Sequence, residues 1–424
     1  MPAGSAASPT GVLPPGVPAD RPARSRLLPM ATVFLRVGLT AFGGPAGHIA
    51  IMRDEFVRRR GWLDDAAFVD LIGAANLIPG PTSSELAMHI GHRRAGRAGL
   101  VVAGLAFLLP AVLIVAVLAW VYVEYGRRPE VAALLAGVTP VVVAIVAHAG
   151  WSIARTTLRS ALQVALLVAA VAAIVAGVPE IAALLGAGVV SIVLVATGVG
   201  RARALGIAVS AWPQAAGTTT GAGATAGSPA GGAAVTGALA AAAAGVATIA
   251  SPGLIFLTFL KIGAVLFGSG YVLVALLRSE LVDGLGWITE TQLVDAVAVG
   301  QVTPGPLFST ATFIGYLVGG PLGAMAATVG VFLPAFLAVA LSIPILDRLR
   351  TSVRARSFLD GVNAAAVGLL GVVAVQLAIT GVRDLVGAAT MIAAFALLLR
   401  GIGTSWLIAA GAAIGVIRWL LAPG

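Results

Sequence analysis

The sequence contains no cysteine among its 424 residues. Disulfide bonds, thiolate metal sites and cysteine nucleophiles are therefore excluded. Charged residues make up only 10% of the chain and aromatic residues only 6%, whereas an ordinary soluble domain carries roughly 25% charged residues. The shortage of charge excludes a chain that is soluble throughout.

Most of the sequence consists of apolar residues. Hydrophobic residues account for 59% of the chain and the mean hydropathy is +1.02. Many apolar runs approach or exceed the about 20 residues that cross a bilayer. They lie at residues 100–122, 131–151, 158–177, 181–198, 254–277, 322–346, 358–379, 385–399 and 405–420. The sequence predicts an all-α polytopic membrane protein with about 10 to 13 transmembrane segments.

The chain is basic, with a net charge of +9. Its arginines lie in short loops between apolar runs, where they set topology and contact anionic lipid head groups. We therefore expect the lipid bilayer as a partner, and no nucleic acid. Residues 1–29 lack the apolar core of a signal peptide, so we expect a disordered tail that is not cleaved.

The chain contains two copies of one unit. Residues 34–38 (FLRVG) align with residues 259–263 (FLKIG), and the Pro-Gly-Pro triplets at 79–81 and 304–306 then coincide, 225 positions apart. After one missing residue the spacing becomes 224, and it still holds where Arg159 aligns with Arg383. Tryptophan, proline and acidic positions keep this register, which indicates duplication. We predict repeat 1 at residues 30–200 and repeat 2 at residues 254–424.

An Ala/Gly/Thr-rich linker at residues 201–253 is expected between the repeats. Its Ala-rich part, Val235 to Ala250, is either part of the linker or a weak extra crossing.

Loop charge predicts that the two repeats have inverted topology. Residues 53–60 contain four arginines, whereas the equivalent residues 278–285 contain one arginine and two acidic residues. Further along the bias reverses: the pair at residues 127–128 in repeat 1 corresponds to four arginines between residues 348 and 356 in repeat 2. Because arginine-rich loops stay on the cytoplasmic side, equivalent loops should face opposite sides of the membrane.

Each Pro-Gly-Pro triplet should break a helix inside the membrane. Proline removes a backbone donor, and glycine tolerates unusual backbone angles. Unpaired backbone groups are costly in hydrocarbon, so such a break is tolerated only beside protein or a watery cavity. Two arrangements fit the spacing: a re-entrant hairpin, or one discontinuous helix that crosses.

The residues after each break predict an anion site. Hydroxyls follow both triplets, at Thr82, Ser83 and Ser84 in repeat 1 and at Ser309 and Thr310 in repeat 2. The free N–H groups at a helix start attract anions. The alternative is that these hydroxyls are ordinary helix caps. In an inverted pair, both starts would meet near the membrane midplane.

Two cations within apolar runs strengthen this hypothesis. Arg36 and Lys261 occupy equivalent positions, and with two helix starts they would give the site roughly +3 charge, which suits a dianion. The alternative is that they snorkel to the interface. The glycines expected to allow close approach of the ligand to the backbone are Gly43, Gly44, Gly80, Gly268 and Gly305.

The stretches FGGPAGHIAIMRDEF (42–56), NLIPGPTSSELAMHIGHRRAG (76–96) and GWITETQLVDAVAVGQVTPGP (286–306) resemble the signatures of the two-domain chromate transporter family. The resemblance covers both repeats and implies inverted halves. It also implies export of chromate across the bacterial cytoplasmic (inner) membrane, conferring chromate resistance, with sulfate as a similar tetrahedral dianion. A sulfate or other inorganic-anion permease on the same scaffold is the alternative.

Protonatable groups near the path are the usual means of coupling transport to a gradient. The candidates are Glu85, Asp70, Asp295, His48, Glu55 and Glu280. Proton/oxyanion antiport with Glu85 or Asp70 as the carrier is the hypothesis. For Glu55 and Glu280 the alternative is structural ion pairing with the nearby Arg53 and Arg278, and for His48 it is a structural role.

A more remote class is a membrane metalloenzyme. Glu85, His89 and His92 share one helical face and are types that ligate zinc, but repeat 2 has Thr310, Ile314 and Leu317 there. We therefore expect no metal, no cofactor and no enzymatic activity. Substrate preference, stoichiometry and oligomeric state, a homodimer included, are left open by the sequence.

Overall fold

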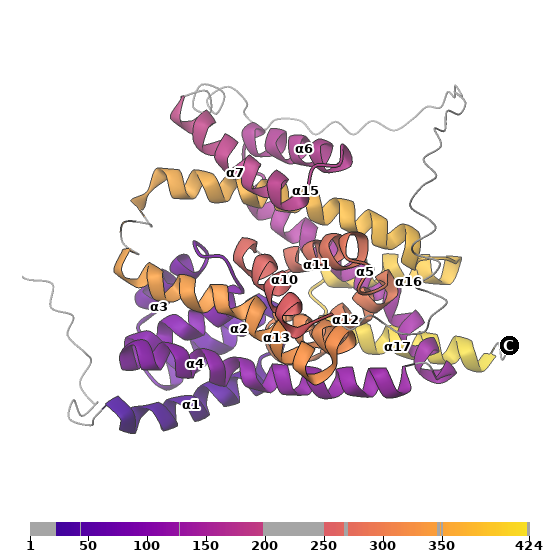
Figure 1. Ribbon diagram of the computed structural model, residues 1–424, viewed down its shortest axis with the longest axis horizontal. Helices are drawn as coiled ribbons and strands as arrows, with labels where there is room; N and C mark the ends of the chain where they lie inside the picture. Colours follow the sequence, from indigo (N-terminus) through magenta and orange to yellow (C-terminus); the bar gives the residue numbers. More distant parts are fainter. Residues whose placement is uncertain are drawn as a thin grey trace, which may run out of the picture.

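A computed structural model describes residues 23–42, 44–126, 128–197, 250–266, 270–345, 348 and 351–421 (Figure 1). All regular secondary structure in these residues is helical, which confirms the all-α prediction. Most of the predicted tail and nearly all of the predicted linker lie outside the described residues, and so do Gly43 and Gly268.

The helices of the first half and of the second half follow one another in the same order. The first half contains α1 (Ala23–Thr40), α2 (Gly44–Arg53), η1 (Asp54–Arg59), α3 (Asp65–Ala75), α4 (Thr82–Tyr125), α5 (Pro129–Thr157), α6 (Ala161–Val175) and α7 (Glu180–Ala196). The second contains α10 (Pro252–Val265), α11 (Val272–Leu277), η2 (Arg278–Gly284), α12 (Glu290–Val302), η3 (Leu307–Ser309), α13 (Thr310–Ser342), η4 (Ile343–Ile345), α15 (Val353–Gly381), α16 (Leu385–Leu399) and α17 (Thr404–Leu421). In Figure 1, α4 ends at the right of the view and α13 ends at the left.

Helix α4 is a helical hairpin. Ala95 and Gly96 have non-helical backbone angles, and Gly96 has a φ of 63°. In a straight helix Gly91 and Gly99 would lie about 12 Å apart along the axis, yet each packs directly against the backbone of the other. The chain therefore folds back within residues 92–97, which include three arginines. In the second half, α13 folds back in the same way at Gly319 and Gly320, and Gly315 packs against Gly323.

This fold-back limits the length of the helix that follows each Pro-Gly-Pro break. The arm from Thr82 to Arg94 would be about 20 Å long at 1.5 Å per residue, which is shorter than the roughly 30 Å hydrocarbon core. The second arm of α4 is long enough to cross. Five helices of the described residues are long and apolar enough to span a membrane, and five shorter apolar helices accompany them. The protein is therefore a multi-pass membrane protein.

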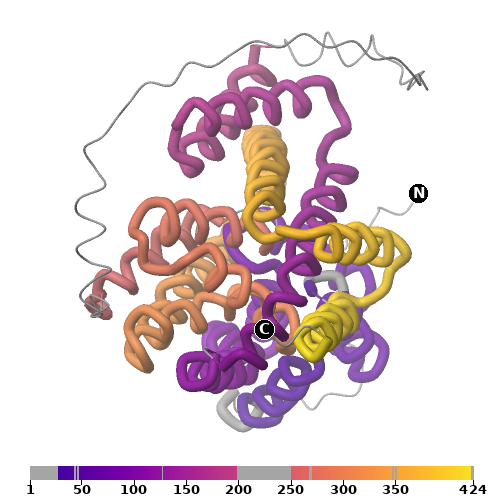
Figure 2. Tube along the Cα trace, turned by 90° about the vertical axis from the view of Figure 1, so that its right-hand side faces the viewer, coloured from indigo at the N-terminus to yellow at the C-terminus, as the bar shows by residue number. Residues whose placement is uncertain are grey.

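The two halves pack crosswise. The last helices of the first half, α6 and α7, pack on α15 of the second half, while α16 and α17 pack on α5. Figure 2 shows α15 nearly end-on, with the magenta helices α6 and α7 arched around it. Glycine makes both contacts close: Gly361 lies against the backbone of Ala187, and Gly137 against that of Gly411. Small residues allow such close helix packing in membranes, and the halves are therefore interlocked.

Candidate functional site

Both Pro-Gly-Pro triplets break a helix, as predicted. In the first half α3 ends at Ala75 and α4 begins at Thr82; in the second, α12 ends at Val302 and η3 begins at Leu307. The central glycines Gly80 and Gly305 have φ angles of 142° and 103°, which L-residues with a side chain rarely adopt. The triplet thus supplies both the stop and the backbone angle of each break.

Each break is tied to the other half of the molecule. The N–H of Gly80 donates to the carbonyl of Leu266, 2.7 Å away, at the end of α10. The N–H of Gly305 donates to the carbonyl of Ala41, 2.8 Å away, just after α1. A Cβ on Gly305 would lie 2.6 Å from that of Ala111 in α4. These reciprocal contacts bring the two breaks together at the interface of the halves.

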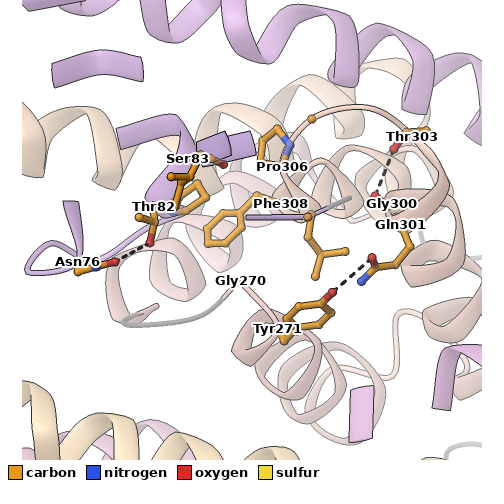
Figure 3. A pocket seen from close by; sticks show the side chains of 15 residues that line it. Asn76, Thr82, Ser83, Gly270, Tyr271, Gly300, Gln301, Thr303, Pro306 and Phe308 are labelled. Atoms are coloured by element: carbon orange, nitrogen blue, oxygen red, sulfur yellow. Dashed lines mark hydrogen bonds between the residues drawn. The ribbon is translucent and has the colours of Figure 1, made fainter. Parts of the chain in front are cut away.

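A cavity of about 210 Å³ lies between the two breaks. Thr82 and Ser83 line it from the start of α4, and Pro306, Leu307 and Phe308 line it from the start of the η3–α13 segment. Figure 3 shows Thr82 and Ser83 lying next to Pro306 and Phe308. We call this space the central cavity; its full lining is Gly44, Ile49, Asn76, Pro81, Thr82, Ser83, Gly270, Tyr271, Gly300, Gln301, Thr303, Gly305, Pro306, Leu307 and Phe308.

Backbone N–H groups at both helix starts lack an acceptor within their own helix. In α4 the first amides with a helical partner are those of Ser84 and Glu85, which donate to the carbonyl of Pro81 at 2.8 and 3.2 Å. The amides of Thr82 and Ser83 precede them and have no such partner. In the second half the amide of Ser309 donates to Pro306 at 3.0 Å, which leaves those of Leu307 and Phe308. All four of these residues line the central cavity.

The predicted hydroxyl residues do not cap these helices. The cap residue of α4 is Pro81, which has no side-chain hydrogen bond to the helix, and Pro306 and Ser309 make none either. The Thr82 hydroxyl instead donates to the side-chain oxygen of Asn76 at 3.3 Å. The alternative of plain helix capping is therefore wrong for the described residues, and the N–H groups of the first turn are left for another acceptor.

Three more predicted hydroxyls lie behind the cavity rather than on it. Ser84, Ser309 and Thr310 are almost fully buried, and none of their hydroxyls has a hydrogen-bond partner in the described part of the chain. The structure therefore brings together Gly44, Thr82, Ser83 and Gly305 from the predicted set at the cavity, with Gly80 next to them.

The two predicted cations lie elsewhere. Arg36 is exposed on α1. Lys261 is 51% exposed, and its Nζ atom forms a 2.6 Å ion pair with Glu280. Neither residue lines the central cavity. Because an apolar helix offers several faces, the position of a cation along it does not decide which face it occupies. Their role in binding stays a prediction from the sequence.

Glu85 lies at the base of the first break. Its side chain is 0% exposed, and neither carboxyl oxygen has a hydrogen-bond partner within the described residues. Its Oε1 atom faces Gly80, so that a Cβ at position 80 would clash with it. An ionised carboxylate in such a site would be an uncompensated buried charge, which is strongly unfavourable. This environment favours the neutral acid, and its counterpart in the second half is the uncharged Thr310.

The paired candidates Asp70 and Asp295 have different surroundings. Asp70 is exposed on α3. Asp295 on α12 is only 2% exposed, and it accepts a 2.7 Å hydrogen bond from the hydroxyl of Tyr122 on α4. This bond joins the two halves inside the protein.

Removing the Tyr122 hydroxyl should destabilise the fold. In Tyr122→Phe the buried Asp295 loses its donor, which should lower the free energy of unfolding by about 1–3 kcal/mol. The midpoint of thermal unfolding in detergent measures this effect. Tyr125→Phe is the matched control, because Tyr125 is exposed and contacts Arg128 only through its ring. Equal midpoints for the two variants would contradict the proposed contribution.

Glu55 and Glu280 are ion-paired, but not with the arginines that their sequence neighbours suggest. Glu55 pairs with Arg60 at 2.6 Å, and Glu280 pairs with Lys261. Arg53 instead binds Asp65 at 2.7 Å. Arg278 binds Asp283 at 2.6 Å and Glu290 at 3.2 Å. The expectation of ion pairs was right for both glutamates, and the expected partners were wrong.

His48 connects the first break to helix α2. Its Nδ1 atom lies 3.1 Å from the hydroxyl of Ser83, and both side chains are buried. Since Ser83 lines the central cavity, His48 lies directly behind the cavity wall. Its Nε2 atom has no partner in the described part of the chain.

Sequence reasoning missed the amide side chains at the cavity. Asn76 directly follows α3 and Gln301 lies near the end of α12, and both line the cavity. Figure 3 shows them at opposite ends of the view, Asn76 bonded to Thr82 and Gln301 to the hydroxyl of Tyr271. The signal was present: Asn76 and Gln301 coincide at the 225-residue spacing.

Among the described residues, no three His, Cys, Asp or Glu side chains lie close enough together to hold a metal ion. The zinc alternative at Glu85, His89 and His92 therefore gains no support from the fold.

Comparisons with known sequences show the family of this chain. The family model described as Chromate transporter matches residues 28–192 and again residues 253–416. A "Chromate transport protein" of Pseudomonas aeruginosa is 36% identical over 350 residues, which cover 81% of this chain and 79% of the relative. A "Chromate transport protein" of Cupriavidus metallidurans is 31% identical over 396 residues, 92% of each chain.

A "Probable chromate transport protein" of Synechococcus elongatus is 30% identical over 354 residues, which cover 83% of this chain and 84% of the relative. No solved structure matches the chain. Since the family model covers both halves and the similarity extends over most of each relative, the chain belongs to the chromate transporter family.

Proposed function

We propose that this protein is a secondary transporter that exports chromate, a tetrahedral dianion, across the bacterial cytoplasmic membrane and thereby confers chromate resistance. The observation that carries the proposal is the meeting of two broken helix starts, one from each half, at a single cavity. The relatives named chromate transport protein supply the substrate class. The opposite directions in which α4 and α13 end (Figure 1) support the inverted topology on which many alternating-access transporters are built.

The central cavity suits a small anion. Its volume of about 210 Å³ is below the roughly 300 Å³ at which pockets for drug-sized ligands begin. The amides of Thr82, Ser83, Leu307 and Phe308 offer four N–H donors, and the two helix starts together contribute a charge of roughly +1. The hydroxyls of Thr82 and Ser83 add polar contacts. Sulfate has the same shape and charge and is the alternative substrate.

Proton coupling is the second part of the proposal. Glu85 is next to the first break, fully buried and without a hydrogen-bond donor among the described residues. It is therefore cut off from water in this conformation and can exchange a proton only when the breaks move apart. Opening to one side and then the other would load and release the proton in step with the anion.

The test is uptake of labelled chromate and sulfate into everted membrane vesicles, with and without an imposed pH gradient. We expect chromate accumulation that the gradient increases. Accumulation of sulfate with no uptake of chromate would replace the proposal with the sulfate permease. Equal uptake by vesicles with and without the protein would reject both.

The same assay tests the two cations. The sequence hypothesis predicts that Arg36→Ala and Lys261→Ala each abolish transport while the protein still inserts normally, because each would remove charge that a dianion needs. Lys261→Ala also breaks the pair with Glu280, so Glu280→Gln is its control for loss of the ion pair alone. Wild-type rates in both alanine variants would reject a role for these cations in binding.

A further inference from the structure

A second cavity, of about 410 Å³, lies beside the central one. We call it the outer cavity. Its lining includes Arg159 from the connection between α5 and α6, Gln163 from α6, and Asp360 and Asn363 from α15. Arg159 and Asp360 are exposed, so the outer cavity opens at the surface of the described structure. Both halves contribute to it.

The two cavities meet at Asn76, the one residue shared by their linings. Asn76 is exposed, and its side-chain oxygen accepts the 3.3 Å hydrogen bond from Thr82. Thr82 is the first residue of α4 and carries one of the N–H groups of the central cavity. The hydrogen bond between Asn76 and Thr82 therefore links the lining of the outer cavity to the helix start at the central cavity.

The outer cavity has the chemistry of an anion capture site. In the described part of the chain the guanidinium of Arg159 has neither an ion pair nor a hydrogen bond. Guanidinium donors match tetrahedral oxyanions well. The carbonyl oxygen of Gln163 accepts from the amides of Arg159 and Ser160, at 2.8 and 3.1 Å, which leaves its NH₂ group to face a ligand. Asp360 carries the opposite charge and opposes anion entry.

We infer that the outer cavity is the entry vestibule for the oxyanion on one side of the membrane, with Arg159 capturing the anion and the Asn76–Thr82 hydrogen bond gating its passage to the central cavity. This inference rests on the proposed function and deepens it. A single positive charge at the entrance should change the rate at which the anion associates more than the rate of the transport step. Charges that line a cleft change association rates by factors of about 10 to 10³.

The chain offers a matched control. Arg383 is the equivalent of Arg159 in the second half, 224 positions on. It is also exposed, its Nε atom donates to the carbonyl of Thr380 at 3.2 Å, and it lines neither cavity. Arg383→Gln therefore removes the same charge from the surface without touching the vestibule.

The experiment measures initial rates of chromate uptake against chromate concentration in everted and right-side-out vesicles. In one orientation, Arg159→Gln should raise the KM about threefold to tenfold with little change in the maximal rate. Arg159→Lys, which keeps a positive charge, should restore most of the affinity. Asp360→Asn should lower the KM, and Arg383→Gln should match the wild type.

The outcomes separate the inference from the function. If Arg159→Gln and Arg383→Gln have the same KM in both orientations, the vestibule is rejected while chromate transport stands. The vestibule is also rejected if Arg159→Gln lowers only the maximal rate, or if Arg159→Lys behaves like Arg159→Gln. If wild-type vesicles take up no chromate, the proposed function itself fails.

Discussion

Glu85→Gln should abolish the stimulation of chromate uptake by a pH gradient. Glutamine has the shape of the neutral acid and fits the fully buried site, so the break beside Gly80 should keep its structure. It cannot carry a proton, however. We expect the gradient-driven part of the uptake to fall at least about tenfold, as when a group that exchanges protons during the cycle is lost. Exchange of labelled for unlabelled chromate without a gradient should persist.

The control is Glu124→Gln, which removes an exposed carboxylate from the same helix and should leave coupling unchanged. Asp295→Asn and Glu55→Gln test the other two buried carboxylate candidates. Both have partners, Tyr122 and Arg60 respectively, and we expect smaller losses of coupling from either. A Glu85→Gln protein with wild-type stimulation by the gradient would remove Glu85 as the carrier.

Gly80→Ala and Gly305→Ala should each reduce the rate of transport by at least about tenfold. A side chain at a positive φ costs about 1–2 kcal/mol, and overpacking adds about 1–3 kcal/mol. The added Cβ would lie 2.8 Å from that of Ala335 in the first variant and 2.6 Å from that of Ala111 in the second. About 1.4 kcal/mol of free energy corresponds to a tenfold change in rate. The added methyl group should push the two breaks apart, and a cost of this size should therefore slow transport.

Two other glycines provide the control for backbone strain alone. Gly61 and Gly286 also have positive φ angles, of 58° and 61°, but a Cβ on either would meet nothing within 4 Å. Gly61→Ala and Gly286→Ala should therefore destabilise the protein slightly and leave initial rates near the wild-type value. Equal losses in all four variants would show that backbone strain, and not the junction of the two breaks, limits transport.

Some of the candidate site could be predicted from the sequence because its causes are local. A Pro-Gly-Pro triplet breaks any helix, so the positions of both breaks and the residues of both helix starts were accessible. The register between the copies adds Asn76 and Gln301, which aligned comparison of the two halves could have identified. Thr82, Ser83 and Gly305 were predicted from the triplets, and Gly44 was predicted as a glycine that allows close approach of the backbone.

The two cations show what the sequence could not predict. Arg36 and Lys261 align with each other and lie in apolar runs, yet both are exposed and away from the cavity. A helix that is apolar all round gives no periodic pattern to show which face turns inward. The carboxylates show the same limit. Asp70 and Asp295 are aligned in the two halves, yet Asp70 is exposed and Asp295 is buried.

By itself the sequence determined that this is a helical membrane protein with two similar halves, broken twice by the same triplet, because hydropathy and backbone chemistry act over a few neighbouring residues. The tertiary structure alone decided that each broken helix is bonded to the opposite half, that α4 and α13 fold back, and that Glu85 is buried with no hydrogen-bond partner among the described residues. The bonds from the breaks to the opposite halves join groups more than a hundred residues apart. The fold-backs and the burial of Glu85 join closer residues, but they too depend on how the segments pack.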